Sequence, residues 1–233
     1  MKRVLLVIIA ATILMSCHIK SGSGNIITEK RNTGSFEGVN VGGGFEVEIS
    51  QGNNREVTVE ADDNLIKYVL TDVENGKLRI RLDDIHARHA HLKVYVTSPV
   101  INFIKASAGA EVKSKDVIRS ENSIQFNVSS GSQVNAAVDA PTIEADASSG
   151  SEVNLSGRTR KVSLEASSGS EINADELLSE TADARASSGA STSIHASVKL
   201  DAKASSGGHV SYKGGASVSK TESSGGEVSR VGE

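Results

Sequence analysis

A short motif, Ser-Ser-Gly or Ser-Ala-Gly, recurs seven times in this chain at nearly constant spacing. Its glycines lie 22, 19, 19, 20, 18 and 18 residues apart: Gly109, Gly131, Gly150, Gly169, Gly189, Gly207 and Gly225. Disordered Ser/Gly linkers do not keep such a register. The spacing indicates a repeat architecture, in which each unit buries its apolar face against its neighbours.

The residues around each glycine alternate between apolar and polar, which is the pattern of a β-strand. In the repeat at Gly169, we expect Val162, Leu164, Ala166 and Ser168 to point inward. The third residue after the glycine is apolar in six of the seven repeats: Val112, Val134, Val153, Ile172, Val210 and Val228. Each repeat therefore predicts a strand, a glycine turn, a second strand and a variable return. Stacked repeats form an all-β solenoid of roughly 19-residue coils, regular over 101–233.

The last coil departs from this pattern. Where the preceding coil has Leu200, Ala202 and Ala204 facing inward, its equivalents are Val218, Lys220 and Glu222. A polar terminal coil suits an open end, because exposed strand edges invite aggregation.

Residues 35–100 alternate like strands but lack the regular period, with turn residues such as Gly42-Gly43-Gly44 and Asn75-Gly76 between them. The segment Asp63–Asp72 predicts a short helix capped by Asp62 or Asp63. We interpret the region as irregular leading coils of the solenoid or as a small β cap on its N-terminal end.

The run Phe36-Glu37-Gly38-Val39, then Gly44-Phe45-Glu46-Val47, and later segments such as Gly169-Ser170-Glu171-Ile172-Asn173, resemble the head GIN domain family. This family is common in Bacteroidetes and is described as auto-transporter adhesins. The resemblance covers about residues 35–220 and implies a right-handed parallel β-helix. It implies no catalytic or binding residues, and its adhesin label is an analogy.

The N-terminus has the features of an export signal. Lys2 and Arg3 precede an apolar stretch that is too short to span a bilayer, and Leu14-Met15-Ser16-Cys17 resembles a bacterial lipobox. We predict that residues 1–16 are a signal peptide and that Cys17, the only cysteine, is lipidated; an ordinary secretory signal is the alternative. Residues 17–34 contain Ser21-Gly22-Ser23-Gly24 near their start and are expected to form a flexible tether.

The predicted partner of this end is a membrane, reached through the lipid anchor. Cleavage would remove two of the 25 basic residues and leave 29 acidic ones, so the mature net charge is about −6, which argues against nucleic acid. Position two after Cys17 is not Asp, which by resemblance to lipoprotein sorting favours the outer membrane. The acidic run of surface-exported lipoproteins is missing, so both the periplasmic and the surface-exposed face remain open.

Two polar columns are candidate ligand-facing ladders. Serines two residues before the glycine form the first column: Ser107, Ser129, Ser148, Ser167, Ser187, Ser205 and Ser223. Glutamates two residues after the glycine, above all Glu152 and Glu171, form the second. Stacked hydroxyls could bind a sugar, and close carboxylates could hold a cation. The alternatives are a structural ladder around a tight turn and a solvated acidic face.

His89 and His91 are weak candidates for a metal site, since histidines two apart in a strand share a face. The alternative is an exposed hairpin loop. We predict no metal and no cofactor.

The sequence predicts no enzyme. It has no tryptophan, three tyrosines and four phenylalanines, and it lacks the usual nucleophile, phosphate and zinc motifs. The leading hypothesis is a non-catalytic envelope lipoprotein, an adhesin-like or scaffold module that contacts envelope proteins or glycans. The alternatives are a carbohydrate-binding or polysaccharide-processing β-helix protein, and an assembly protein whose coil ends stack with other copies.

Overall fold

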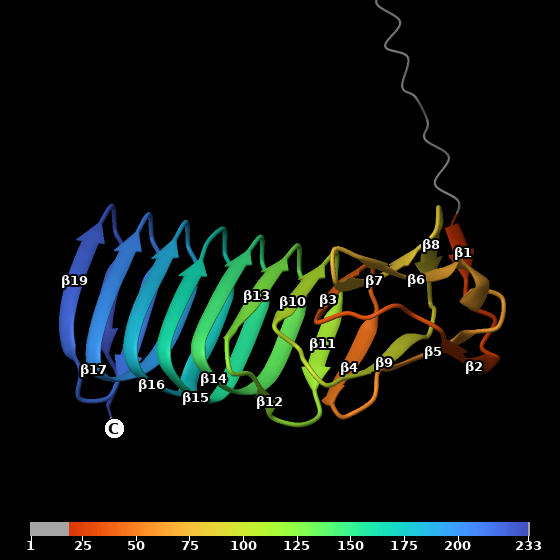
Figure 1. Cartoon of the computed structure of the whole chain (residues 1–233). Helices are drawn as coiled ribbons and strands as arrows, with labels where there is room; N and C mark the ends of the chain where they lie inside the picture. Colours follow the sequence, from red (N-terminus) through yellow and green to blue (C-terminus); the bar gives the residue numbers. More distant parts are fainter. Residues whose placement is uncertain (1–18, 233) are drawn as a thin grey trace, which may run out of the picture.

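The computed structural model describes residues 19–232, which form a rod of stacked β-coils with a less regular cap at its N-terminal end (Figure 1). The predicted signal peptide and Cys17 lie outside the described residues. Within residues 19–232, no helix is long and apolar enough to cross a membrane. The all-β solenoid predicted from the repeat is confirmed.

Parallel pairing between successive coils builds the rod. The strands before the glycine turns stack in the order β7 (Lys77–Leu82), β3 (Gly38–Gly42), β10 (Phe103–Ser107), β13 (Ser123–Ser129), the second parts of β14 to β17, and β19 (Ser217–Ser223). The strands after the turns stack in the order β9 (Leu92–Ser98), β4 (Glu46–Gln51), β11 (Glu111–Ser114), the first parts of β14 to β17, β18 (His209–Lys213) and β20 (Glu227–Arg230).

The middle coils are nearly continuous strands, because their return segments are also extended. They are β14 (Gln133–Ser148), β15 (Glu152–Ala166), β16 (Glu171–Ser187) and β17 (Ser191–Ser205), with the short β12 (Ile118–Arg119) pairing with β14. The register shifts between Asn154 and Ser156, and again between Ala174 and Leu178. These irregularities absorb the differences in repeat length.

The seven glycine turns align in one column, as predicted, and form the row of tips along the upper edge of Figure 1. In the middle coil both Ser168 and Gly169 have positive φ, 54° and 69°, and the N–H of Ser170 donates to the carbonyl of Ser167 at 3.2 Å. Two successive left-handed residues make a type I′ turn, which glycine adopts without strain. The Gly169 N–H also donates to the carbonyl of Ser188 in the next coil at 3.1 Å, so the turns are linked from coil to coil.

The inward columns are buried as the alternation predicts. Val162, Leu164 and Ala166 are at most 1% exposed, and the residue three after each glycine, apolar in six repeats and Thr192 in the other, is likewise buried. Ser168 is the exception: it is exposed, not inward. The strand period ends at Ser167 because the left-handed turn begins there, and the inward position passes to Ser170, which is 2% exposed.

The region of residues 35–100 contains both of the expected alternatives. β3 and β4 form a coil that pairs with the β10–β11 coil on one side and with a layer made by β7 and β9 on the other. The chain therefore leaves the stack after β4 and returns at β7 and β9 on the outer side of the coil that it has just formed. Antiparallel strands then cover that layer: β5 (Glu56–Asp62) pairs with β9, and β6 (Val69–Glu74) pairs with β7.

The helix predicted over Asp63–Asp72 is wrong. Only η1 (Ile66–Tyr68) is helical, and its N-cap, Leu65, makes no side-chain capping bond. The following residues form β6, because the Asn75-Gly76 turn, with φ of 50° and 71°, closes a two-residue hairpin with β7. Pairing with the sheet outweighs the local helix signal.

The flexible tether expected over 17–34 is not what the described residues show. β1 (Ile19–Ser21) pairs in parallel with β8 (His86–Arg88), and β2 (Ile26–Arg31) pairs antiparallel with β5. The turn between β1 and β2 is held by side chains of the cap.

Charged side chains close the C-terminal end of the core, as the polar last coil predicts. The Lys220 ammonium donates to the Val228 carbonyl at 2.8 Å, and Glu222 accepts from the Val228 N–H at 2.7 Å. Two inward side chains of β19 thereby cross the open end and bind the backbone of β20.

Candidate functional site

The serine column lies on the surface as a continuous ladder. Ser129 pairs with Ser148, and Ser187 with Ser205, each one coil apart. Six of the seven candidate serines are half-buried, and Ser223 in the terminal coil is exposed. Ser129, Ser148 and Ser167 border a shallow hollow of about 450 Å³ together with Asp146 and Glu165. Their hydroxyls can therefore reach a ligand.

The glutamate column is also continuous, with Glu152 directly paired to Glu171. A second ladder, not predicted, supports it. Asn154 donates from Nδ2 to the Asn135 side-chain oxygen at 2.9 Å and to Glu152 at 2.7 Å, and Asn173 repeats both bonds in the next coil at 3.1 Å. The asparagine amides thus orient the carboxylates.

The asparagine ladder has a clear sequence signal. Asn135, Asn154 and Asn173 each stand four residues after the glycine, and Ser193 continues the column with a hydrogen bond to the Asn173 side-chain oxygen at 3.2 Å. In a strand this column lies beside the glutamates on the same face. The same spacing argument that found the glutamates therefore also finds these residues.

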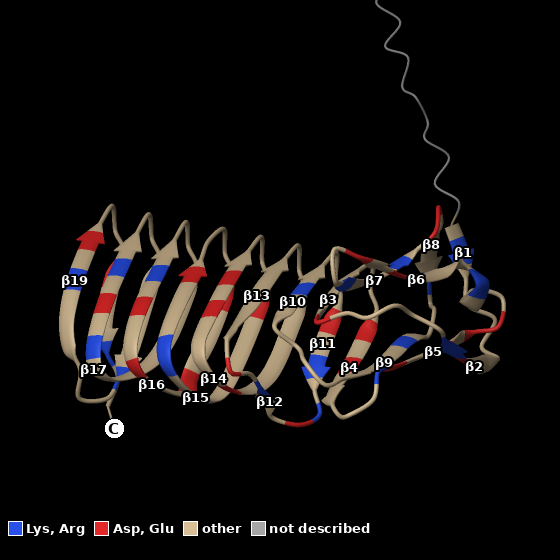
Figure 2. Ribbon diagram, in the orientation of Figure 1, with Lys and Arg blue, Asp and Glu red and all other residues tan. Residues whose placement is uncertain are grey.

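The strands before the turns carry a column whose charge changes sign along the rod. Asp146 and Glu165 are neighbours in successive coils, and Arg185 and Lys203 follow them (Figure 2). Partial burial, followed by the nearby carboxylates of Glu165 and Glu144, raises the pKa of Asp146. Like charges at one-strand spacing repel each other, which favours the protonated form of Asp146.

The two candidate histidines do not come together as a metal site. His91 lies beside Glu60, with Nε2 and Oε1 2.6 Å apart, while His89 occupies a left-handed turn position with φ of 45°. Across residues 19–232, no three His, Cys, Asp or Glu side chains are grouped closely enough to hold a metal ion. The expected loop is also partly wrong, since His86–Arg88 forms β8.

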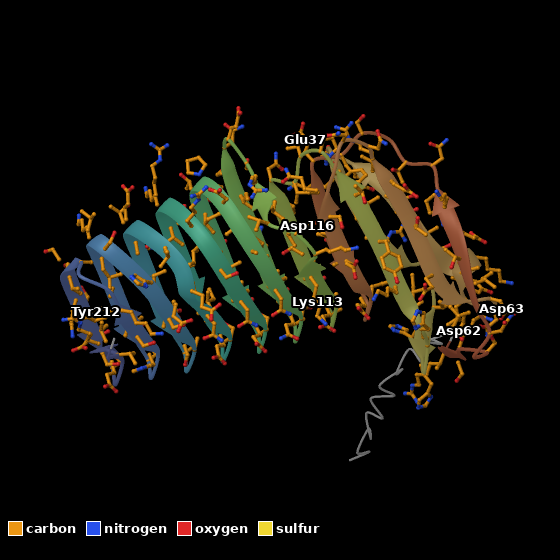
Figure 3. The ribbon with its side chains drawn as sticks, turned by 90° about the horizontal axis from the view of Figure 1, so that it is seen from below. Glu37, Asp62, Asp63, Lys113, Asp116 and Tyr212 are labelled. Atoms are coloured by element: carbon orange, nitrogen blue, oxygen red, sulfur yellow. The ribbon has the colours of Figure 1, made fainter. Side chains whose placement is uncertain are left out.

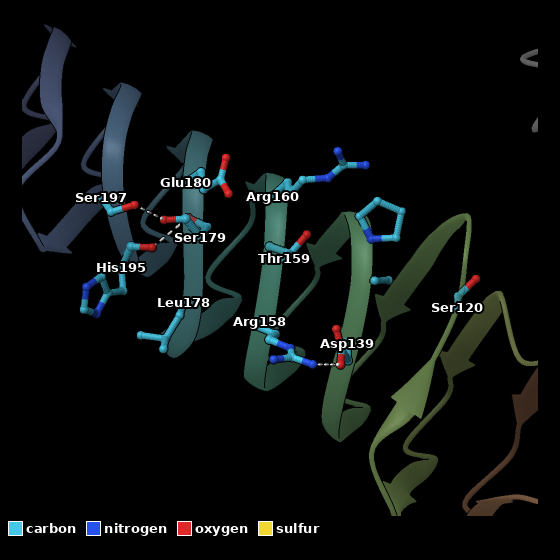
Figure 4. A pocket seen from close by; sticks show the side chains of 12 residues that line it. Ser120, Asp139, Arg158, Thr159, Arg160, Leu178, Ser179, Glu180, His195 and Ser197 are labelled. Atoms are coloured by element: carbon cyan, nitrogen blue, oxygen red, sulfur yellow. Dashed lines mark hydrogen bonds and ion pairs between the residues drawn. The ribbon is translucent and has the colours of Figure 1, made fainter.

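A groove of about 600 Å³, not predicted from the sequence, crosses the return segments of successive coils (Figure 4). Its floor contains Ala140, Thr159 and Ser179, each at most 8% exposed. The hydroxyls of Thr159 and Ser179 already donate to backbone carbonyls, at 3.0 and 2.6 Å. The floor therefore has no hydroxyl hydrogen left to donate to a ligand.

The rim of the groove carries apolar side chains and charges of both signs, Arg158 and Arg160 with Asp139 and Glu180. Leu178 is 55% exposed, and His195 lies beside it on the next coil. Arg158 is paired with Asp139 at 2.7 Å, whereas Arg160 has no carboxylate partner among the described residues. These residues come from return segments of irregular length, so no column in the sequence brings them together.

A family model described as "Putative auto-transporter adhesin, head GIN domain" matches residues 35–216. The chain belongs to this family. The membership confirms the resemblance drawn from the leading strands and the glycine coils. No curated protein matches the chain.

Solved structures share the fold of this head GIN domain protein. A "putative adhesin" from Bacteroides fragilis has a TM-score of 0.82 at 17% identity, covering 91% of this chain and 98% of its own. A "putative adhesin" from Parabacteroides distasonis has a TM-score of 0.76 at 20% identity, covering 91% and 100%. A "putative lipid binding protein" from Parabacteroides distasonis has a TM-score of 0.72 at 19% identity, covering 92% and 100%. At these identities the likeness establishes the fold alone.

Proposed function

We propose that this head GIN domain protein is a non-catalytic lipoprotein of the cell envelope, anchored through Cys17, which uses the flat sides of its rod for adhesion-like binding. The family description and the names of two structural neighbours, both putative adhesins, support an envelope role. The lipobox pattern supports the anchor, and a residue other than Asp at position two after Cys17 favours the outer membrane.

The observation that carries the binding role is the pair of ladders on the strands after the turns. Glu152 and Glu171 repeat at one-strand spacing, about 4.8 Å, and Asn154 and Asn173 hold them by hydrogen bonds. A rigid row of this kind presents the same donor and acceptor pattern several times. It suits a partner that also repeats, such as a glycan chain or another strand surface.

The test is retention of protein-coated microspheres on mucin-coated and glycan-array surfaces. We expect the chain lacking residues 1–17 to be retained, and Asn154→Lys with Asn173→Lys to lose most of that retention. Ser219→Lys with Thr221→Lys, two exposed positions on β19, is the matched control and should change little. Equal retention of the ladder variant and the parent protein would contradict the proposal.

The anchor has its own test. Cells that express the full chain are labelled with an alkyne analogue of palmitate, and Cys17→Ser is the comparison. Label on the parent chain alone supports lipidation at Cys17. Equal label on both chains rules it out.

A second candidate function is the binding of an anionic amphiphile in the groove. The name of one structural neighbour, a putative lipid binding protein, suggests this function. The groove favours it because its volume is usual for small ligands and the hydroxyls of its floor are already hydrogen-bonded. Arg160 at the rim is also unpaired among the described residues. An acyl chain needs no hydrogen bonds from that floor. A sugar needs several, and it gains from stacking on aromatic rings, which the groove lacks.

Displacement of cis-parinaric acid by palmitate tests this candidate. Leu178→Asp places a carboxylate on the rim, and we expect at least ten-fold weaker binding. Val198→Asp is the matched control, because Val198 is equally exposed at 59% and does not line the groove. No saturable binding to the parent protein would exclude the groove as a lipid site.

A further inference from the structure

The N-terminal segment is fastened to the cap by a set of hydrogen bonds. The buried carboxylate of Asp62, 2% exposed, accepts from the Gly24 N–H and from the His91 N–H, both at 2.7 Å. Asp63 accepts from the Ser23 hydroxyl at 2.6 Å and from the Asn25 amide at 2.9 Å. We call these contacts, between residues 21–25 and 62–64, the clasp.

The clasp depends on glycine at two positions. Gly24 has a φ of 82°, and a Cβ on Gly22 would overlap the Asp62 carboxylate. That carboxylate cannot move away without losing its two backbone donors. The Ser-Gly-Ser-Gly sequence is therefore built for close approach to the cap.

The clasp leaves almost no linker between Cys17 and the folded rod. Ile19 already belongs to β1, which pairs with β8, so a single residue separates it from Cys17. The two chain steps from Cys17 to Ile19 span at most about 7 Å. An acyl group on Cys17 would bring the cap end of the rod into the headgroup region of its bilayer.

The surface at this end has the composition of a membrane-contacting surface. Ile19 and Ile26 are 50% and 49% exposed, and among the described residues only Leu178 and Val198, on separate coils of the rod, are large apolar side chains with greater exposure. Lys20 and Lys67 both lie 5.2 Å from the centre of the Tyr68 ring. Lysine and tyrosine with an apolar body and a polar tip are favoured at membrane interfaces.

We propose that the cap end sits directly on the phospholipid surface that holds the acyl chains, through Ile19, Lys20, Ile26, Lys67 and Tyr68. The clasp fixes the rod so that its coils project away from the bilayer. The proposal rests on lipidation of Cys17. Figure 3 shows Asp62 and Asp63 of the clasp at one end of the rod and Tyr212 at the other.

The rival arrangement is a rod lying along the bilayer. Its flat sides carry rows of Ser, Asn and Glu and a column that runs from Asp146 and Glu165 to Arg185 and Lys203, and these polar side chains gain nothing from contact with acyl chains. The projecting arrangement keeps those ladders accessible. β19 lies eight strand spacings from β7, or about 38 Å, beyond the reach of the headgroups.

Single-cysteine labelling tests the proposal, since the native chain has no cysteine except the one that carries the lipid. The lipidated full chain is reconstituted in phosphatidylcholine vesicles that contain headgroup-nitroxide lipid. An NBD fluorophore is placed at Ile26→Cys or, as the distal control, at Val198→Cys; both native side chains are exposed. We expect quenching at position 26 to be at least five-fold stronger than at position 198.

Each outcome is decisive. Similar quenching at both positions means that the rod lies flat, and no quenching at either position means a long tether; both overturn the proposal. Vesicle flotation of the parent chain, lost in Cys17→Ser, is measured first. If the parent chain does not float, the anchor itself fails and this inference fails with it, which separates that failure from a wrong orientation.

Gly22→Ala tests the clasp without a change of charge. Opening the clasp would turn residues 18–25 into a linker with a mean reach of about 15 Å, so quenching at position 26 should fall at least two-fold. Gly215→Ala is the matched control, because a Cβ there meets nothing within 4 Å. Unchanged quenching in Gly22→Ala would show that the clasp does not hold the rod.

Discussion

The solenoid register makes a sharp prediction at Leu164. Its side chain is 0% exposed and its neighbours in the columns before and after are Ala145 and Ala184. Leu164→Ala removes roughly three buried methylene equivalents, or about 2.4 kcal/mol of transfer free energy. The small neighbours cannot extend into the gap, and parallel pairing on both sides prevents collapse of the backbone, so a cavity term adds to this loss. We expect a total of about 3–4 kcal/mol.

Lys220→Ala is the comparison, because Lys220 occupies the equivalent column of the terminal coil and is exposed. It loses one hydrogen bond to the Val228 carbonyl, worth about 0.5–1.5 kcal/mol. Urea melts of the chain lacking residues 1–17 measure both variants. Stacked repeats can unfold in parts, so equal m-values are required before the free energies are compared. A loss at Leu164 no larger than at Lys220 would refute the inward register.

Three further predictions test the turn, the buried serine column and the acidic column. Ser168→Gly should stabilise the turn by roughly 0.5–1 kcal/mol, because Ser168 has a φ of 54°, which glycine adopts with less strain. Gly169→Ala should destabilise the turn for the same reason. A shift in melting temperature of the opposite sign in either variant would contradict this. Ser170→Ala should cost about 1 kcal/mol, because its hydroxyl shares one hydrogen between the Ala147 and Ser167 carbonyls and accepts from the Ser167 N–H. Ser132→Ala in the same column should cost nearly nothing, because that buried hydroxyl has no partner among the described residues; equal losses in urea melts would argue against this difference. The raised pKa of Asp146 means that its charged form is disfavoured in the folded protein, so this carboxylate lowers stability above the folded pKa, and the penalty fades as the pH falls through that value. Asp146→Asn should therefore stabilise the protein at pH 7 and have less effect near pH 3. A stability difference between variant and parent that stays constant with pH would count against this cause.

The sequence predicts most where one rule repeats. The inward columns around Leu164 and the glycine turns are recovered because the same alternation appears coil after coil, and each coil confirms the next. The position of Ser168 is missed because alternation assumes an extended backbone, and two positive φ values reverse the direction of the side chains at the turn.

The sequence predicts least where a contact is made once. Residues 63–72 show a helix signal, but the Asn75-Gly76 hairpin to β7 decides their structure. Ser and Gly in residues 21–24 are typical of a flexible linker, yet Gly22 and Gly24 serve the contact with Asp62. Composition alone does not separate a glycine that gives freedom from a glycine that permits close approach. The groove at Leu178 lies where coil lengths differ, so no period reveals it.

At both ends of the rod the outermost strands have no further coil to pair with, and the two ends protect those strands in different ways. The difference bears on which end faces the membrane in the proposed orientation. The N-terminal end is covered by backbone pairing, as β5 and β6 run antiparallel over the outermost layer. The C-terminal end keeps a free strand edge and protects it with Lys220 and Glu222, whose charges bind the backbone of Val228 across the core. Charged side chains on an edge discourage pairing with another chain in water, but they are costly to place against lipid. In the proposed orientation the end with the exposed isoleucines, where Lys30 and Glu56 pair with each other, faces the bilayer, and the end with Lys220 and Glu222 faces solvent.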